Sequence, residues 1–156
     1  MRLDTAFDLC DAIGTAIRAA HNSWDVSTLV DVQVDSSKLT ADGVEFALFP
    51  VSNEEVVEKD SRHAIGTEVI VAMRLRTRIA SRASSAEIRE KCGLWDEACA
   101  VIQRAQGFDL GDRGHFRWNA GTVALNVEAL RKDRCVFISA IDTSFMAVRR
   151  NPKWSS

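Results

Sequence analysis

The sequence lacks the motifs that mark small enzymes and metal proteins. Its four cysteines include no Cys-x-x-Cys pair, which excludes a zinc ribbon and a thioredoxin-type motif. Neither a Gly-x-Ser-x-Gly elbow nor a His-Glu-x-x-His pair occurs, and no Gly-Lys-Ser/Thr phosphate loop is present. We therefore expect no catalytic residues, no cofactor and no metal site of a familiar kind.

Neither charge nor hydropathy marks the chain as a nucleic-acid-binding or membrane protein. The formal net charge is −2, so no global field attracts nucleic acid. No apolar run approaches the roughly 20 residues that a membrane span requires, and no basic-then-apolar leader begins the sequence. We expect a soluble protein of a reducing compartment, with free thiols and no membrane partner.

The hydrophobic pattern predicts one α+β domain. A chain of 156 residues can bury a real core without disulfides, and we place the domain at residues 1–150 and an exposed tail at 151–156. Three- and four-residue apolar steps predict amphipathic helices, and two-residue alternation predicts strands. The prediction is a mostly antiparallel or mixed sheet flanked by two main helices. The helices are expected at 3–21 and 84–106, and the strands at 29–35, 44–51, 67–78, 116–118, 122–125 and 134–148.

The most distinctive feature is a predicted long hairpin with charges of opposite sign along its length. Its loop is acidic, with Glu54, Glu55, Glu58 and Asp60. Its second strand has apolar residues at the odd positions 69, 71, 73, 75 and 79, whereas Arg74, Arg76 and Arg78 occupy even positions. Because successive side chains of a strand point to opposite faces, the three arginines should share one face.

This arginine row allows three interpretations. The first is a solvated sheet face. The second is an interface in which the arginines pair with the acidic loop of a neighbouring copy, since charge segregation suits self-association. The third is a diffuse contact with DNA phosphates, without base readout.

Other candidate residues have a plain structural alternative. Asp112 and His115 lie in a glycine-rich loop and offer an acid/base pair, but such combinations also arise by chance in surface loops. Cys92 and Cys99 are two helical turns apart, too far for a disulfide, and are predicted to pack in the core. Trp118 and Trp154 stand in polar surroundings and point to a partner surface, where tryptophan is enriched.

In its order of elements, the chain resembles the tail terminator (tail-completion) proteins of long-tailed bacteriophages. The likeness covers most of the chain and lies in order, spacing and texture. It is carried by the N-terminal helix leading into residues 29–35, by 46–52 with the acidic run to 62, by the strand through 69–73 followed by a helix, and by 135–142. The glycine-rich segment 108–121 belongs to no family pattern.

The resemblance implies a structural role in the virion. Such proteins form a hexameric ring on the last ring of the tail tube, stop tube growth and offer a docking surface to head-completion proteins. Expected partners are therefore other copies of the chain, the tail tube protein and a head-completion or stopper protein, with possible non-specific contact to DNA in the lumen. Assembly would take place in the host cytoplasm, and no catalysis or cofactor is implied.

A ring needs two different surfaces that meet head to tail. We expect the loop acids Glu54, Glu55, Glu58 and Asp60 to form one surface. Arg74, Arg76 and Arg78 would be their partners or would face the lumen. Two other classes remain open: a different neck component, such as a stopper or adaptor, and a small enzyme that uses Asp112 and His115.

Overall fold

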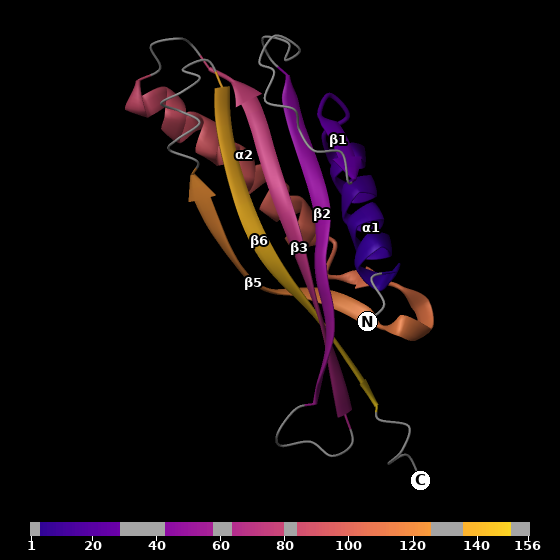
Figure 1. Ribbon diagram of the computed structural model, residues 1–156. Coiled ribbons are helices and arrows are strands. Elements are labelled where there is room, and N and C mark those ends of the chain that lie inside the picture. Colours follow the sequence, from indigo (N-terminus) through magenta and orange to yellow (C-terminus); the bar gives the residue numbers. More distant parts are fainter. Residues whose placement is uncertain (1–3, 29–42, 58–63, 80–83, 126–135, 151–156) are drawn as a thin grey trace.

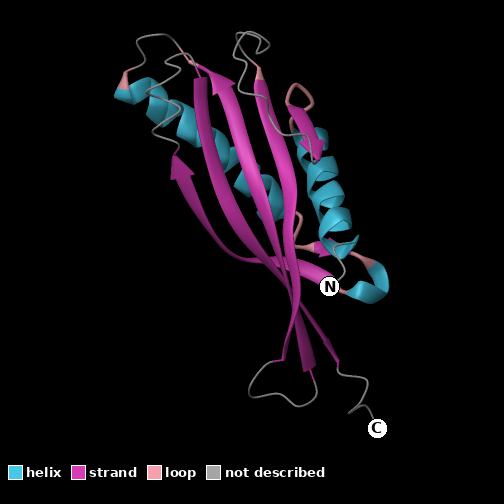
Figure 2. Ribbon diagram, viewed as in Figure 1, coloured by secondary structure: helices cyan, strands magenta, loops and turns pink. Residues whose placement is uncertain are grey.

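The computed structural model describes residues 4–28, 43–57, 64–79, 84–125 and 136–150, and it has the predicted α+β architecture (Figures 1 and 2). A curled, six-stranded mixed sheet carries two α-helices. The elements are α1 (Asp4–Ala20), β1 (Asp25–Thr28), β2 (Val44–Val57), β3 (Ala64–Arg78), α2 (Ser85–Arg104), β4 (Phe108–Asp109), the 3₁₀ turn η2 (Gly111–Arg113), β5 (His115–Leu125) and β6 (Val136–Arg150).

The strand order is β1-β2-β3-β6-β5-β4. The sheet is mixed because β1 is parallel to β2, whereas each of the other neighbouring pairs is antiparallel. The pairing of β2 with β3 extends from Val44 opposite Thr77 to Val57 opposite Ile65. Glu58 and Asp60 lie outside the described residues, and for Glu54 and Glu55 only the backbone is described.

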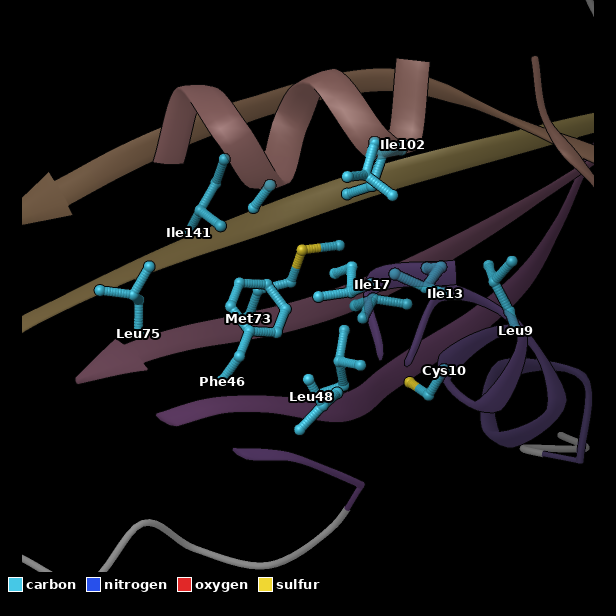
Figure 3. Close-up of a cluster of buried hydrophobic side chains, with 14 of the residues drawn as sticks. Leu9, Cys10, Ile13, Ile17, Phe46, Leu48, Met73, Leu75, Ile102 and Ile141 are labelled. Atoms are coloured by element: carbon cyan, nitrogen blue, oxygen red, sulfur yellow. The ribbon is translucent and has the colours of Figure 1, made fainter. Parts of the chain in front are cut away.

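The predicted alternation of β3 is confirmed. Val69, Val71, Met73, Leu75 and Ile79 are all buried. Alternation in the last strand predicts that Phe137, Ile141, Phe145 and Ala147 share its core face. This prediction is confirmed as well, since all four are buried in β6. These side chains form one continuous core with buried residues of both helices, part of which is drawn in Figure 3. The face of β3 that bears the arginines is therefore the one turned away from the core.

Helix α1 is amphipathic, as predicted from its sequence. Three- and four-residue steps predict a buried stripe of Leu3, Phe7, Cys10, Ile13, Ile17 and Ala20. Of these, Cys10, Ile13 and Ile17 are fully buried, together with Ala6 and Leu9, and Phe7 is half-buried. Ala20, at the C-terminal end of the predicted stripe, is exposed. The Arg18 guanidinium donates to the carbonyl oxygen of Val26 at 3.1 Å, which ties the end of α1 to β1.

For helix α2 the sequence predicts a capping box of Ser84 and Glu87 at its start, a left-handed cap at Gly107 beyond its end, and a buried stripe of Ile88, Cys92, Trp95, Cys99 and Ile102. The helix begins and ends at these signals. The Ser84 hydroxyl accepts a hydrogen bond from the backbone N–H of Glu87 at 3.3 Å, as a capping box requires. Beyond the helix, Gln106 and Gly107 have φ values of 54° and 101°, which reverses the chain direction. Trp95 and Ile102 are buried as predicted. The prediction that Cys92 packs in the core is wrong, because this thiol is exposed. The buried stripe of α2 includes Ala98 and Val101 instead.

The strands differ from the predicted ones in two places. The segments predicted as two strands at 116–118 and 122–125 form one continuous strand, β5, whose register shifts between Trp118 and Ala120. The bulge absorbs one residue, so Asn119 does not interrupt the strand. The predicted strand 29–35 lies outside the described residues, whereas a parallel strand that was not predicted, β1, precedes it.

Beyond the helices, three strands extend from the body of the protein as an arm. The arm consists of residues 53–57 of β2, 64–68 of β3 and 146–150 of β6, paired in that order. Figure 1 shows it projecting below both helices. On its β2 side lie Glu54 and Glu55, and Arg149 and Arg150 are on its β6 side.

Candidate assembly surfaces

The arginine row lies on the sheet face opposite the core, but its three members have different surroundings. Arg76 is 3% exposed, and Arg74 and Arg78 are half-buried. The Arg74 guanidinium carbon lies 5.7 Å from the centre of the Phe49 ring, a cation–π distance. The row is therefore not a uniformly solvated stripe.

Arg76 is paired within its own hairpin. It faces Glu45 of β2 in the strand register, and its Nη2 lies 2.8 Å from a Glu45 carboxylate oxygen. Its Nε donates to the same oxygen at 3.0 Å. Because both charges are largely removed from water, each needs the other, and the pair stabilises the register of β2 and β3. Glu45 was not singled out from the sequence. The two-residue alternation of side chains along each strand nevertheless places it on the same sheet face as Arg76.

In the strand register, Glu54 of β2 lies opposite Glu68 of β3 at the base of the arm. The Glu68 side chain is half-buried. Among the described residues, Glu68 has no ion-pair partner.

The loop that contains Asp112 and His115 is held by internal bonds. The Asp109 carboxylate accepts a hydrogen bond from the backbone N–H of Gly111 at 2.9 Å. The N–H of Leu110 donates to the carbonyl of Gly114 at 2.9 Å. Arg113 forms an ion pair with Asp8 of α1. These contacts attach the turn to the start of the first helix.

His115 is used at the end of helix α2. Its Nε2 lies 2.8 Å from the carbonyl oxygen of Gln106, where it satisfies an acceptor beyond the last helical turn. The ring lies so close that a Cβ on Gly107 would collide with the same nitrogen. Asp112 is exposed on η2. The geometry thus gives His115 a role in the fold.

No metal centre is formed by the described residues: they contain no group of three or more His, Cys, Asp or Glu side chains that could hold an ion. Two of the cysteine thiols, those of Cys10 and Cys99, are also poor ligands. Burial, with a smaller contribution from Asp11, raises the pKa of Cys10 to about 12. Burial, and then Asp96, raises the pKa of Cys99. Both thiols are therefore held in the neutral form, which does not bind metals well.

A groove opens between the C-terminal end of α2 and the first part of β5. It has a volume of about 480 Å³ and is lined by Ile102, Gln103, Gln106, Gly107, Arg117 and Trp118. Trp118, a predicted partner-surface residue, is half-buried and packs against the core. Arg117 is exposed and has no ion-pair partner among the described residues. Trp154 lies outside the described residues.

The groove was not predicted from the sequence. It depends on β5 running past the end of α2, and this follows from the turn at Gln106 and Gly107 and from the pairing of β4 with β5. The only sequence signal was the pair of Trp118 and its basic neighbour Arg117.

No protein-family model matches the chain, and no curated protein matches it. Of the helices that the structure describes, none is long and apolar enough to cross a membrane.

Proposed function

We propose that the protein is a tail terminator of a long-tailed bacteriophage, a structural subunit that forms a ring on the end of the tail tube. The ring, hexameric as in the family that the sequence resembles, stops polymerisation of the tube protein and offers its other side to a head-completion protein. It assembles in the host cytoplasm and remains in the virion, without catalysis or a cofactor.

The observation that carries the proposal is the projecting arm with its charged base. Its base belongs to the core of one copy, since Thr67 and Ala147 are buried, whereas the strands beyond the base project past both helices (Figure 1). Glu68, at the base of the arm, has no ion-pair partner among the described residues, so a cationic surface on another copy would suit it. A head-to-tail ring is the simplest assembly in which every copy meets such a surface.

In this proposal the hairpin is long and charged, and its loop acids Glu54, Glu55, Glu58 and Asp60 reach the next copy. Arg74 and Arg78 then either receive these acids or face the lumen, where DNA phosphates would be diffuse partners. Arg76 already has Glu45 as its partner, so its part in the interface is to hold the hairpin in register. Trp118 and Trp154 belong to the contact surfaces.

Deletion of the gene from the genome that encodes it tests the proposal. If the ring stops tube growth, electron microscopy of the particles should show overlong tubes, and heads without attached tails. Supplying the protein from a plasmid should restore normal tail length. Particles that assemble normally without the protein would contradict the proposal.

The arginines are tested in the same complementation assay. The double variant Arg74→Glu with Arg78→Glu should fold and yet fail to restore tail length. The matched control is Arg89→Glu with Lys91→Glu, two charge reversals on α2, and it should complement. Arg76 is left unchanged in both variants, because its reversal would unfold the hairpin and obscure the result.

A further inference from the structure

We infer that the exposed side of helix α1 of a second copy packs on the arginine-bearing face of the sheet, the face turned away from the core. The inference rests on the ring in the proposed function and deepens it, because it assigns α1, in place of the loop acids, as the partner of Arg74 and Arg78. The sheet face and the exposed side of α1 are different surfaces of one chain. Their contact is therefore head to tail and continues from copy to copy until a ring closes.

The sheet face is the first argument. Buried residues of both described helices belong to one core with the opposite face of β3, so neither of these helices covers the face with the arginines. Strand alternation and register nevertheless place four large, half-buried hydrophobic side chains on it: Phe49, Ile70, Ile138 and Met146. When helices cover only one face of an antiparallel sheet, the other face is usually polar. An apolar second face therefore indicates a further layer.

The residue pattern of α1 is the second argument. Positions at three- and four-residue steps share one side of a helix, and an exposed stripe on α1 consists of Asp4, Asp8, Asp11, Thr15 and Ala19. The stripe is acidic over its N-terminal half and has small side chains over its C-terminal half. Because small side chains allow close packing against a helix, the C-terminal half suits the apolar part of the sheet face.

Charge is the third argument. Arg78 of β3 is half-buried and Asp4 of α1 is exposed, and neither has an ion-pair partner among the described residues. Asp8 already pairs with Arg113 of its own copy, so Asp4 is the acid that gains most from a new cation. Complementary charges of this kind fix the register of an interface.

The two surfaces also agree in length and direction. Asp4 and Ala19 are roughly 22 Å apart along the helix axis, and Arg78 and Ile70 are roughly 26 Å apart along the strand. With Asp4 beside Arg78, α1 of the second copy runs antiparallel to β3, and its small residues reach the apolar part of the face. Asp142, an exposed acid on this face, lies near the Ile70 end and so stays away from Asp4.

Charge reversal at Asp4 and Arg78 tests the contact. Arg78→Glu and Asp4→Arg should each weaken self-association of the full chain at least about tenfold, because each variant places like charges against each other. The double variant, Asp4→Arg with Arg78→Glu, should restore association, since the two charges are exchanged across the interface. Sedimentation over a concentration series measures association, and circular dichroism checks that each variant is folded.

Milder variants and matched controls complete the test. Asp4→Asn and Arg78→Gln remove one charge without adding a like one, so they should weaken association less, and they replace the reversals if a reversal impairs folding. Ala19→Trp, at an exposed position of α1, should fold and still weaken association, because it holds the helix away from the sheet. Arg89→Glu and Glu90→Arg, at exposed positions of α2, should leave association unchanged.

The inference is overturned if either single reversal associates as the unchanged protein does, or if the double variant remains as weak as the single ones. Loss of association in Arg78→Glu alone would mean that another surface meets the arginines. The inference is also overturned if the unchanged protein shows no association at any concentration.

Failure of this interface is separate from failure of the proposed function. Association that follows the predicted pattern, with normal tails after gene deletion, would keep the interface and remove the tail function. Overlong tubes after gene deletion, with association that ignores both reversals, would keep the function and remove the interface.

Discussion

Arg76 of β3 and Glu45 of β2 form an ion pair of 2.8 Å that leaves the arginine side chain 3% exposed. The two residues are opposite each other in the strand register. Of the three arginines at alternate positions of β3, Arg76 is therefore buried and paired, whereas its neighbours Arg74 and Arg78 are half-buried. Substitutions in this row must be interpreted residue by residue.

Reversal of the charge at Arg76 should destabilise the protein strongly. In Arg76→Glu, two carboxylates would face each other in a largely buried site, and the free energy of unfolding should fall by roughly 3–5 kcal/mol. Denaturant unfolding followed by circular dichroism measures the change. Arg76→Met combined with Glu45→Leu replaces the pair by apolar groups and should cost far less, since neither charge is left alone. Equal losses in both variants would show that the ion pair does not fix the register.

Gly107 is the second position at which the structure predicts a sharp effect. Its φ of 101° is a conformation that side chains rarely adopt, and a Cβ would collide with the His115 Nε2. Gly107→Ala should therefore lower stability by roughly 1–3 kcal/mol, measured by denaturant unfolding. Gly93 provides a matched control inside α2, because a Cβ there meets nothing within 4 Å.

Gly93→Ala should raise stability by roughly 0.5–1 kcal/mol, since alanine is the better helix former. Two costs arise at Gly107: the collision of a Cβ with the His115 ring and the strained backbone conformation. The combined variant, Gly107→Ala with His115→Ala, removes the collision and keeps the backbone strain. It also loses the hydrogen bond between His115 and Gln106. If Gly107→Ala and Gly93→Ala changed stability in the same direction, the close approach of His115 to the helix end would be wrong.

The parts of the fold that were predicted correctly depend on local patterns. Alternation from Val69 to Ile79 identified the core face of β3, and Ser84 with Glu87 identified the start of α2. Each of these signals is contained within a short stretch of sequence. The wrong predictions concern residues whose burial depends on tertiary contacts. Cys92 has the correct helical spacing for the core stripe, yet α2 is rotated so that Ala98 and Val101 are buried instead.

The candidate surfaces were less predictable than the fold. The sequence drew attention to Arg76, but its partner Glu45 is 31 residues away and is identified only once the hairpin register is known. The groove needs α2 and β5 to meet, which no local pattern specifies.

The cysteines should differ in reactivity in the native protein. Cys10 is fully buried, and burial raises its pKa from an ordinary value near 9 to about 12. Cys92 is exposed, so an alkylating reagent at neutral pH should modify it rapidly and Cys10 only on unfolding. Peptide mapping by mass spectrometry follows each cysteine separately. Rapid native-state labelling of Cys10 would contradict the packing of α1.

The raised pKa of Cys10 also predicts a pH dependence of stability. The buried thiol stays neutral when the unfolded thiol already ionises, so the unfolded state is favoured as pH rises from about 9 towards 12, while the contribution is constant below that range. The difference in unfolding free energy between the unchanged protein and Cys10→Ala should therefore shrink over this window. A difference that does not depend on pH would mean that Cys10 ionises equally in both states.

The last prediction concerns the glycine-rich loop and separates a structural role from a catalytic one. Asp109 accepts a hydrogen bond from the N–H of Gly111, whereas Asp112 is exposed on η2. Asp109→Ala should lower stability by about 1 kcal/mol through the lost turn bond, and Asp112→Ala should leave it within about 0.5 kcal/mol of the unchanged protein. Denaturant unfolding measures both, and complementation of the gene deletion measures function. If the loop only supports the fold, Asp112→Ala complements fully. If Asp112→Ala folds normally and yet fails to complement, the carboxylate acts on something outside the chain, and the acid/base interpretation of Asp112 with His115 would displace the purely structural role.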